Sequence, residues 1–250
     1  MKAEAERIHE AVAAIYGEHA RAGGKASGCC TVEQPASVDY SAEELAAVPA
    51  GAYLGAGSGN PVRWAELKPG ETAIDLGSGA GMDSFLAANQ VGPGGRVYGF
   101  DLTPEMIARA RRNLTPKYSN VSFEQAKIEQ LPIASATADV AISNCVINLA
   151  PDKSKVFAEI FRVLRPGGRM AIADIVLRGE AQAVEQVRRN PAPEKWCACV
   201  LGALPEEDYW NAIRDAGFMD LRSVSERAAM LQPGGDVRSV AVTFTARKPE

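Results

Sequence analysis

The sequence predicts an α/β fold with a mostly parallel sheet, and two observations support this prediction. From residue 72 onward, short apolar segments of strand length alternate with amphipathic segments of helical length. Glycine-rich turns separate these segments, and the first of them, at 77–81, lies between a strand and a helix. Strands that alternate with helices at this spacing are typical of βαβ units, in which a crossover helix makes neighbouring strands parallel.

The part of the chain before residue 72 is predicted to contain helices and loops. Apolar residues at helical spacing predict a first helix to about Tyr16, and Gly17 is expected to break it. Ser41 and Glu44 have the spacing of a capping box at the start of a short helix. Pro61 suits the first turn of a further helix in the segment Asn-Pro-Val-Arg-Trp-Ala-Glu-Leu.

The alternating part is expected to contain five strands and four helices. The strands are 72–76, 96–101, 121–125, 138–143 and 169–177, and the helices are 83–91, 104–114, 153–164 and 205–216. Segments 221–227 and 237–247 are expected to pair as a final antiparallel hairpin.

Composition limits the classes of function. The chain has 250 residues, 46% of them hydrophobic, which is enough for one to two domains with a core. Lys and Arg number 27 against 31 Asp and Glu, a net charge of -4, and a weakly acidic chain lacks the basic face that nucleic acids require. No apolar run reaches the roughly 18 residues of a membrane span, and no signal-peptide core is present. We therefore expect a cytoplasmic protein that binds neither nucleic acid nor membranes.

The glycine-rich turn gives the first functional prediction. Gly77, Gly79 and Gly81 would let the backbone approach a ligand and adopt dihedral angles that other residues avoid. The next strand ends in Asp101, whose carboxylate can accept both ribose hydroxyls of a bound nucleoside. NAD enzymes share this arrangement, and a simple tight turn also uses it. Asp83, near the start of the following helix, would repel a pyrophosphate, which favours a nucleoside without phosphate.

This pattern resembles the first motif of the class I S-adenosylmethionine (SAM) methyltransferases. Three later segments extend the resemblance: Gln-Ala-Lys-Ile-Glu-Gln-Leu-Pro at 125–132, Ala-Asp-Val-Ala-Ile-Ser-Asn at 138–144 and Leu-Arg-Pro-Gly-Gly-Arg at 164–169. The resemblance implies a Rossmann-like, seven-stranded, mostly parallel sheet with helices on both faces and a C-terminal antiparallel hairpin.

The resemblance also implies which residues surround SAM. In such enzymes Ile128 would pack on the adenine, Glu129 would accept its amino group, and Asn144 would lie near the methionine part. Met106 would border the adenine. Glu129 and Met106 also have simpler interpretations, as a solvated loop acid and as a core residue respectively. The expected cofactor-binding residues are Asp75, Gly77, Gly79, Gly81, Asp101, Leu102, Met106, Ile128, Glu129 and Asn144.

Five cysteines distinguish this chain: Cys29, Cys30, Cys145, Cys197 and Cys199. An odd number in a reducing compartment argues against a disulfide framework. Cysteines often pack in the core as small hydrophobic residues. Cys29 and Cys30, however, are adjacent in a loop that contains Gly and Ser, and such a loop has no core in which they could be buried. A tetrahedral zinc site is disfavoured because the chain has no Cys-x-x-Cys pair and only two His. Thiolates from three segments instead suit a soft, three-coordinate centre such as trivalent arsenic or antimony.

The chain resembles the arsenite SAM methyltransferases, most specifically in Ser-Asn-Cys-Val-Ile-Asn-Leu at 143–149 and Cys-Val-Leu-Gly-Ala-Leu at 199–204. The resemblance implies that Cys145 and Cys199 bind arsenic together with a cysteine nearer the N-terminus, either Cys29 or Cys30. Cys197 receives no role from it. We expect a monomer with a helical extension at 1–60, a SAM-binding core at 61–178 and an acceptor cap with the final sheet elements at 179–250.

This family membership would make the protein an arsenic-detoxifying enzyme. A trivalent arsenical would arrive as a thiol conjugate, and its lone pair would attack the methyl group, so no strong general base is required. The pentavalent product would then need an external thiol reductant such as glutathione or thioredoxin. Three alternatives remain: methylation of a small organic acceptor, as in quinone biosynthesis, metalloid binding without turnover, and a mercury or tellurium acceptor in place of arsenic. Only 6% of residues are aromatic, which disfavours the first.

Overall fold

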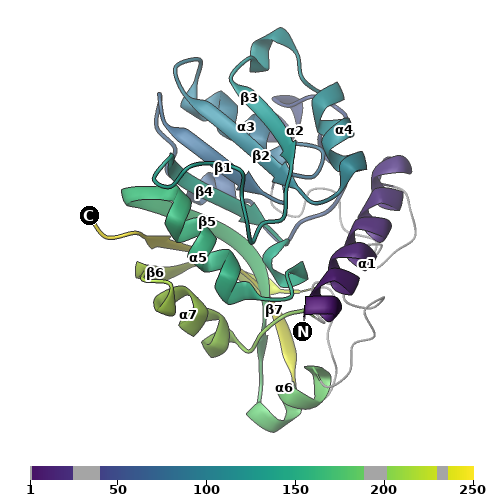
Figure 1. Ribbon diagram of the computed structural model, residues 1–250, viewed down its shortest axis with the longest axis vertical. Coiled ribbons are helices and arrows are strands. Elements are labelled where there is room, and N and C mark those ends of the chain that lie inside the picture. The colour runs from purple at the N-terminus through teal and green to yellow at the C-terminus, as the bar shows by residue number, and fades with distance from the viewer. Residues whose placement is uncertain (1, 25–39, 189–201, 230–235) are drawn as a thin grey trace.

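The structure is a computed structural model that describes residues 2–24, 40–188, 202–229 and 236–250 (Figure 1). Of the five cysteines, Cys145 is described, whereas Cys29, Cys30, Cys197 and Cys199 lie outside the described residues.

The described strands form one seven-stranded sheet in the order β3-β2-β1-β4-β5-β7-β6. The first five strands are parallel, and β7 pairs antiparallel with both β5 and β6. The bounds are β1 Thr72–Leu76, β2 Arg96–Asp101, β3 Val121–Gln125, β4 Ala138–Asn144, β5 Leu164–Arg178, β6 Met219–Ala228 and β7 Arg238–Arg247. The predicted fold, including the antiparallel hairpin, is confirmed. Strand order reverses between β1 and β4, which is where ligands bind in open α/β sheets.

Helices cover both faces of the sheet (Figure 1). One hydrophobic cluster joins the sheet to α5 and α7, and a second joins the opposite face to α3 and α4. The α-helices are α1 Lys2–Arg21, α2 Ala42–Ala46, α3 Met82–Val91, α4 Pro104–Arg112, α5 Lys153–Val163, α6 Ala181–Arg188 and α7 Glu206–Asp215, and the 3-10 turns are η1 Pro61–Trp64, η2 Pro116–Tyr118 and η3 Ile147–Leu149. Within the described part of the chain, no helix has the length and apolar character that spanning a bilayer requires.

The first helix is longer than the sequence predicts, because α1 continues through Gly17 to Arg21. Gly17 faces α4, and a Cβ there would lie 2.9 Å from the Glu105 carboxylate, so the glycine permits close packing of the two helices. Gly23 and Gly24 follow the end of α1, and their positive φ angles of 64° and 83° suit a left-handed C-terminal turn.

Two further predictions differ from the structure, one helix has no counterpart in the sequence predictions, and one prediction is confirmed. Residues Pro61–Trp64 form only a 3-10 turn, which Asn60 caps by accepting from the Arg63 N–H at 3.2 Å. Strand β5 begins at Leu164 rather than at residue 169, with a register irregularity against β4. Helix α6 was not expected. The capping box at 41–44 is confirmed, with both reciprocal hydrogen bonds present.

Candidate functional site

A cavity of about 200 Å³ lies at the carboxyl ends of the central strands. Its walls come from α1, the segment 52–58, the turn after β1, the start of α4, the loop after β3 and the end of β4. Most of the residues predicted from sequence line it: Gly77, Gly79, Asp101, Leu102, Met106, Ile128, Glu129, Asn144 and Cys145. Asp75 and Gly81 do not line it.

The turn after β1 has the left-handed backbone that its glycines permit. Gly77 and Gly79 have φ angles of 71° and 52°. The N–H groups of Gly77 and Ser78 donate to the carbonyl oxygen of Phe100 on β2, at 2.7 and 2.9 Å. These bonds hold the turn close to the end of β2, where Asp101 lies.

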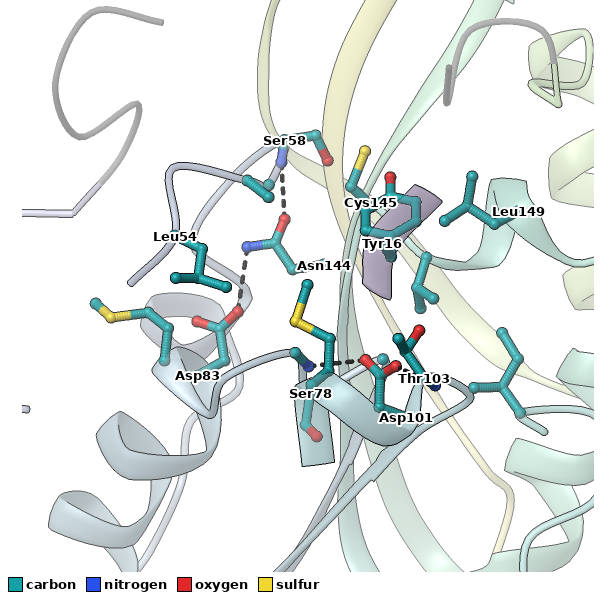
Figure 2. Close-up of a pocket in the computed structure, with 18 of the residues that line it drawn as sticks. Tyr16, Leu54, Ser58, Ser78, Asp83, Asp101, Thr103, Asn144, Cys145 and Leu149 are labelled. Atoms are coloured by element: carbon teal, nitrogen blue, oxygen red, sulfur yellow. Dashed lines mark hydrogen bonds between the residues drawn. The ribbon is translucent and has the colours of Figure 1, made fainter. Parts of the chain in front are cut away.

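Both carboxylate oxygens of Asp101 accept backbone hydrogen bonds (Figure 2). Oδ2 accepts from the Gly79 N–H at 2.9 Å and Oδ1 from the Thr103 N–H at 2.8 Å. Burial raises the pKa of Asp101, and these backbone hydrogen bonds act to lower it. Since each carboxylate oxygen can accept a second bond, the fixed group can also receive a pair of vicinal hydroxyls from the cavity.

Asp75 supports the glycine turn from below the cavity. Its buried Oδ2 accepts from the Ser84 hydroxyl at 2.6 Å, which links β1 to the first turn of α3. Burial, followed by the negative charge of Asp83, raises the pKa of Asp75 well above its ordinary value. Direct contact between Asp75 and a cofactor stays a prediction.

A buried network fixes the side chain at the end of β4. The Tyr40 hydroxyl donates to Asp83 Oδ1 at 2.7 Å, and Asn144 Nδ2 lies 3.1 Å from Asp83 Oδ2 and 2.9 Å from the Tyr40 oxygen. Asn144 Oδ1 accepts from the Ser58 N–H at 2.8 Å (Figure 2). Burial raises the pKa of Asp83 to about 6. Asn144 therefore joins three segments of the cavity wall, and its contact with a cofactor stays a prediction.

Two serine hydroxyls on the cavity wall have no hydrogen-bond partner among the described residues. Ser58 and Ser78 are 5% and 7% exposed, and their Oγ atoms are fully buried. Arg227 also lines the cavity and donates to the Ser58 carbonyl oxygen at 2.8 Å. Buried polar atoms normally have a partner, so this part of the cavity suits a ligand that bears polar groups. The methionine end of SAM, with its ammonium and carboxylate groups, fits this requirement.

The opposite part of the cavity is apolar and is covered by α1. Met106 and Ile128 are buried there. His9 Nε2 on α1 lies 2.9 Å from Glu129 Oε1, and both side chains are almost buried. The sequence prediction did not include His9. The spacing of His9, Val12 and Tyr16, which all line the cavity, is that of one helix face and could have indicated it.

Cys145 follows β4 in a backbone conformation that side-chain-bearing residues seldom adopt. Its φ angle is 59°, and its N–H donates to the Ala173 carbonyl oxygen on β5 at 2.8 Å. The side chain is partly exposed and lines the cavity beside Asn144 (Figure 2). In the described part of the chain, no group of three or more His, Cys, Asp or Glu side chains is arranged to hold a metal ion.

A buried polar cluster, also absent from the sequence prediction, lies behind Cys145. Asp174 on β5 is 0% exposed and accepts hydrogen bonds from the Asn148 N–H at 3.1 Å and from the Tyr209 hydroxyl at 3.0 Å. Burial raises the pKa of Asp174 to about 6. Its only signal in the sequence is an acidic residue within the apolar run Met-Ala-Ile-Ala-Asp-Ile-Val.

The strand order, the glycine turn after β1 and the acidic residue at the end of β2 together define a class I SAM-dependent methyltransferase fold. A family model described as "Methyltransferase domain" matches residues 67–217. An arsenite methyltransferase of Halobacterium salinarum is 43% identical over 89% of this chain and 59% of its own length. Another, of Aquipseudomonas alcaligenes, is 32% identical over 95% of this chain and 71% of its own.

A solved structure gives the same result. The arsenic(III) S-adenosylmethionine methyltransferase of Chlamydomonas reinhardtii is 30% identical, with a TM-score of 0.68 over 92% of this chain and 74% of that one. The chain belongs to the arsenite methyltransferase family. It spans 59% of the length of its Halobacterium relative.

Proposed function

We propose that this protein uses SAM to methylate trivalent arsenic, which cysteine thiolates bind. The biological role of this reaction would be arsenic detoxification. The observation that supports this most directly is the position of Cys145. Its side chain lines the same cavity as Asp101 and the glycine turn, and it lies at the carboxyl end of β4, the strand that pairs with β1. A thiol there can hold a soft metalloid beside a bound nucleoside.

The cavity offers a distinct environment to each part of SAM. Asp101 would accept the ribose hydroxyls, Met106 and Ile128 would contact the adenine, and Glu129 would accept its amino group. The unpartnered hydroxyls of Ser58 and Ser78 would bind the polar methionine end. SAM supplies an electrophilic methyl group, which the lone pair of trivalent arsenic takes up.

The protein's main contribution would be to position the two reactants, because arsenic is itself the nucleophile. Cys145 would bind arsenic together with Cys199 and either Cys29 or Cys30, all three of which lie outside the described residues. Each arsenic–sulfur bond formed by ligand exchange releases a thiol of the incoming conjugate. The pentavalent product would regain two electrons from two thiols, which form a disulfide that external glutathione or thioredoxin reduces. We further propose that the enzyme is a cytoplasmic monomer.

An assay of the purified full chain tests this proposal. The protein is incubated with SAM, glutathione and arsenite, and methylated arsenicals and S-adenosylhomocysteine are quantified by chromatography and mass spectrometry. We expect both products in the wild type and at least a 100-fold loss of arsenite methylation in Cys145→Ser, with SAM affinity unchanged. Cys197→Ser is the control, because the family resemblance assigns that cysteine no role. Full turnover by Cys145→Ser would contradict the proposal, and arsenite binding without turnover in the wild type would favour the metalloid-binding alternative.

A further inference from the structure

The turn that contains Cys145 is under conformational strain. A φ angle of 59° is seldom adopted by a residue with a side chain and persists only where the surroundings enforce it. The hydrogen bond from the Cys145 N–H to the Ala173 carbonyl oxygen fixes one end of this turn. The question is what fixes the other end, which continues directly into η3.

Asp174, the residue after Ala173, fixes the other end. Its Oδ2 accepts from the N–H of Asn148 within η3, so adjacent residues of β5 contact both ends of the turn. The Asn148 side chain adds a bond of 2.6 Å from Nδ2 to the Ile175 carbonyl oxygen. Three successive residues of β5 therefore hold the segment that begins at Cys145.

The carboxylate of Asp174 is itself held by neighbouring groups. Its Oδ1 accepts from the Ile175 N–H at 2.8 Å, and its Oδ2 accepts from the Tyr209 hydroxyl on α7 at 3.0 Å. The buried Lys153 ammonium donates to the carbonyl oxygens of Asn148 and Ala150, so a cation is hydrogen-bonded to η3 and to the residue that follows it. A buried carboxylate is costly unless it is hydrogen-bonded, and here it is bonded to the turn.

Tyr209 also lies within electrostatic reach of the thiol. Burial, then the charge of Asp174, and to a smaller extent the charge of Cys145 raise the pKa of Tyr209. Aromatic contacts with Phe157 and Phe244 fix the Tyr209 ring, with centroid distances of 5.4 Å to each. The network therefore runs from the rigid core of the sheet to the turn beneath Cys145.

We propose that Asp174, oriented by Tyr209, is a positioning residue for the arsenic ligand Cys145. Its carboxylate accepts a hydrogen bond from the backbone N–H of Asn148 and so maintains the left-handed turn that places the Cys145 thiol on the cavity wall. This inference rests on the proposed function in one respect only, the identity of Cys145 as an arsenic ligand. The placement of the thiol is a separate claim that does not involve arsenic.

The test uses Asp174→Asn and Tyr209→Phe in the full chain, with Asp139→Asn as the matched control. Asp139 lies at the opposite end of β4 and likewise accepts a backbone N–H bond, from Thr72 at 2.8 Å. Hydrogen–deuterium exchange of peptides that cover residues 144–150 reports on the turn. Equilibrium dialysis against arsenite and calorimetric titration with SAM report the two affinities.

We expect Asp174→Asn to accelerate exchange in 144–150 about tenfold and to weaken arsenite binding about tenfold, because a hydrogen bond to a charged group is lost. SAM affinity should fall much less than arsenite affinity. Tyr209→Phe should cause smaller changes than Asp174→Asn in both the exchange rate and the arsenite affinity. In a Cys145→Ser background, Asp174→Asn should cause no further loss of arsenite affinity, since it acts through that residue.

Unchanged exchange in 144–150, or an equal effect of Asp139→Asn on that segment, would overturn the inference. An equal loss of arsenite and SAM affinity would also overturn it, because a general structural defect would explain both. Failure of the proposed function has a different signature, namely arsenite affinity that Cys145→Ser leaves unchanged. The exchange measurement still decides the role of Asp174 in placing Cys145 in that case.

Discussion

Val146 packs directly against the α-carbon of Gly77, so that a Cβ at Gly77 would lie 2.5 Å from two atoms of the Val146 side chain. Val146 follows Cys145, and Gly77 begins the glycine turn after β1. The turn that bears the thiol and the turn expected to contact SAM are therefore in van der Waals contact. Movement of either turn changes the relation between the two proposed reactants.

Gly77→Ala tests this contact. The substitution introduces an overlap with Val146 and a side chain at a φ of 71°, so we expect at least a tenfold loss of both SAM and arsenite affinity. Gly92→Ala is the matched control, because Gly92 has a similar φ of 67° but no atom within 4 Å of the Cβ position. Titration calorimetry measures the SAM and arsenite affinities of both variants, and urea unfolding measures their stability. Equal consequences from both variants would show that backbone strain alone is responsible.

Asp101→Asn is expected to weaken SAM binding by roughly 10- to 100-fold. Both Asp101 oxygens accept backbone N–H bonds, so an amide would direct an N–H group toward the N–H of Gly79 or Thr103. The carboxylamide would also lose the charge that strengthens bonds to ribose hydroxyls. Calorimetric titration with S-adenosylhomocysteine measures the effect without turnover. An affinity within twofold of the wild type would contradict the assignment of Asp101 to the ribose.

His9→Ala is expected to weaken SAM affinity about three- to tenfold, because the His9–Glu129 contact holds α1 over the apolar end of the cavity. Glu6→Ala is the control on the same helix. It removes an exposed ion pair with Lys127, two residues from Glu129, and exposed pairs contribute little. The comparison requires only the dissociation constants of SAM. If both variants bind SAM as the wild type does, the His9–Glu129 contact has no role in cofactor affinity.

The pH dependence of stability should reveal the buried Asp83. Its pKa rises from an ordinary 3.8 to about 6 in the folded protein, so the folded state binds more protons than the unfolded state between these values. The contribution of Asp83 to the free energy of unfolding is therefore greatest at low pH and declines as pH rises from about 4 to 6. Asp83→Asn, which does not titrate, should lack this decline.

Urea unfolding of the wild type and Asp83→Asn from pH 4.5 to 7.5 measures the difference between them. Asp174 also has a raised pKa of about 6, but it is present in both proteins, so its contribution cancels in the comparison. The charge of Asp83 acts to raise the pKa of the buried Asp75, so its removal also reduces the contribution of Asp75 to the decline, in the same direction. Parallel stability profiles would mean that Asp83 titrates at its ordinary value.

The parts of the fold that could be predicted from sequence are those governed by local pattern. The strands 72–76, 96–101 and 121–125 agree with the structure residue for residue, because each is a short apolar segment bounded by turn residues. Gly17 was misjudged because tertiary packing against Glu105 outweighs its low helix propensity.

The candidate site was only partly predictable for a related reason. Asp101 ends β2 and Cys145 directly follows β4, so topology alone brings them to one edge of the sheet. Tyr40, His9 and Asp174 reach the site through side-chain contacts between segments far apart in sequence. Such contacts have no local signature in a single chain, and the geometry is needed to find them.

The strand order has a consequence for how the chain folds as it is synthesised. β7 lies between β5 and β6, although it is the last of the strands in sequence. Until residues 238–247 emerge from the ribosome, β6 has no partner among the described strands, and the edge of β5 that pairs with β7 presents unpaired backbone groups. The part of the sheet formed by β5, β7 and β6 is thus completed last. A nascent chain that is halted before β7 would expose an aggregation-prone edge on β5.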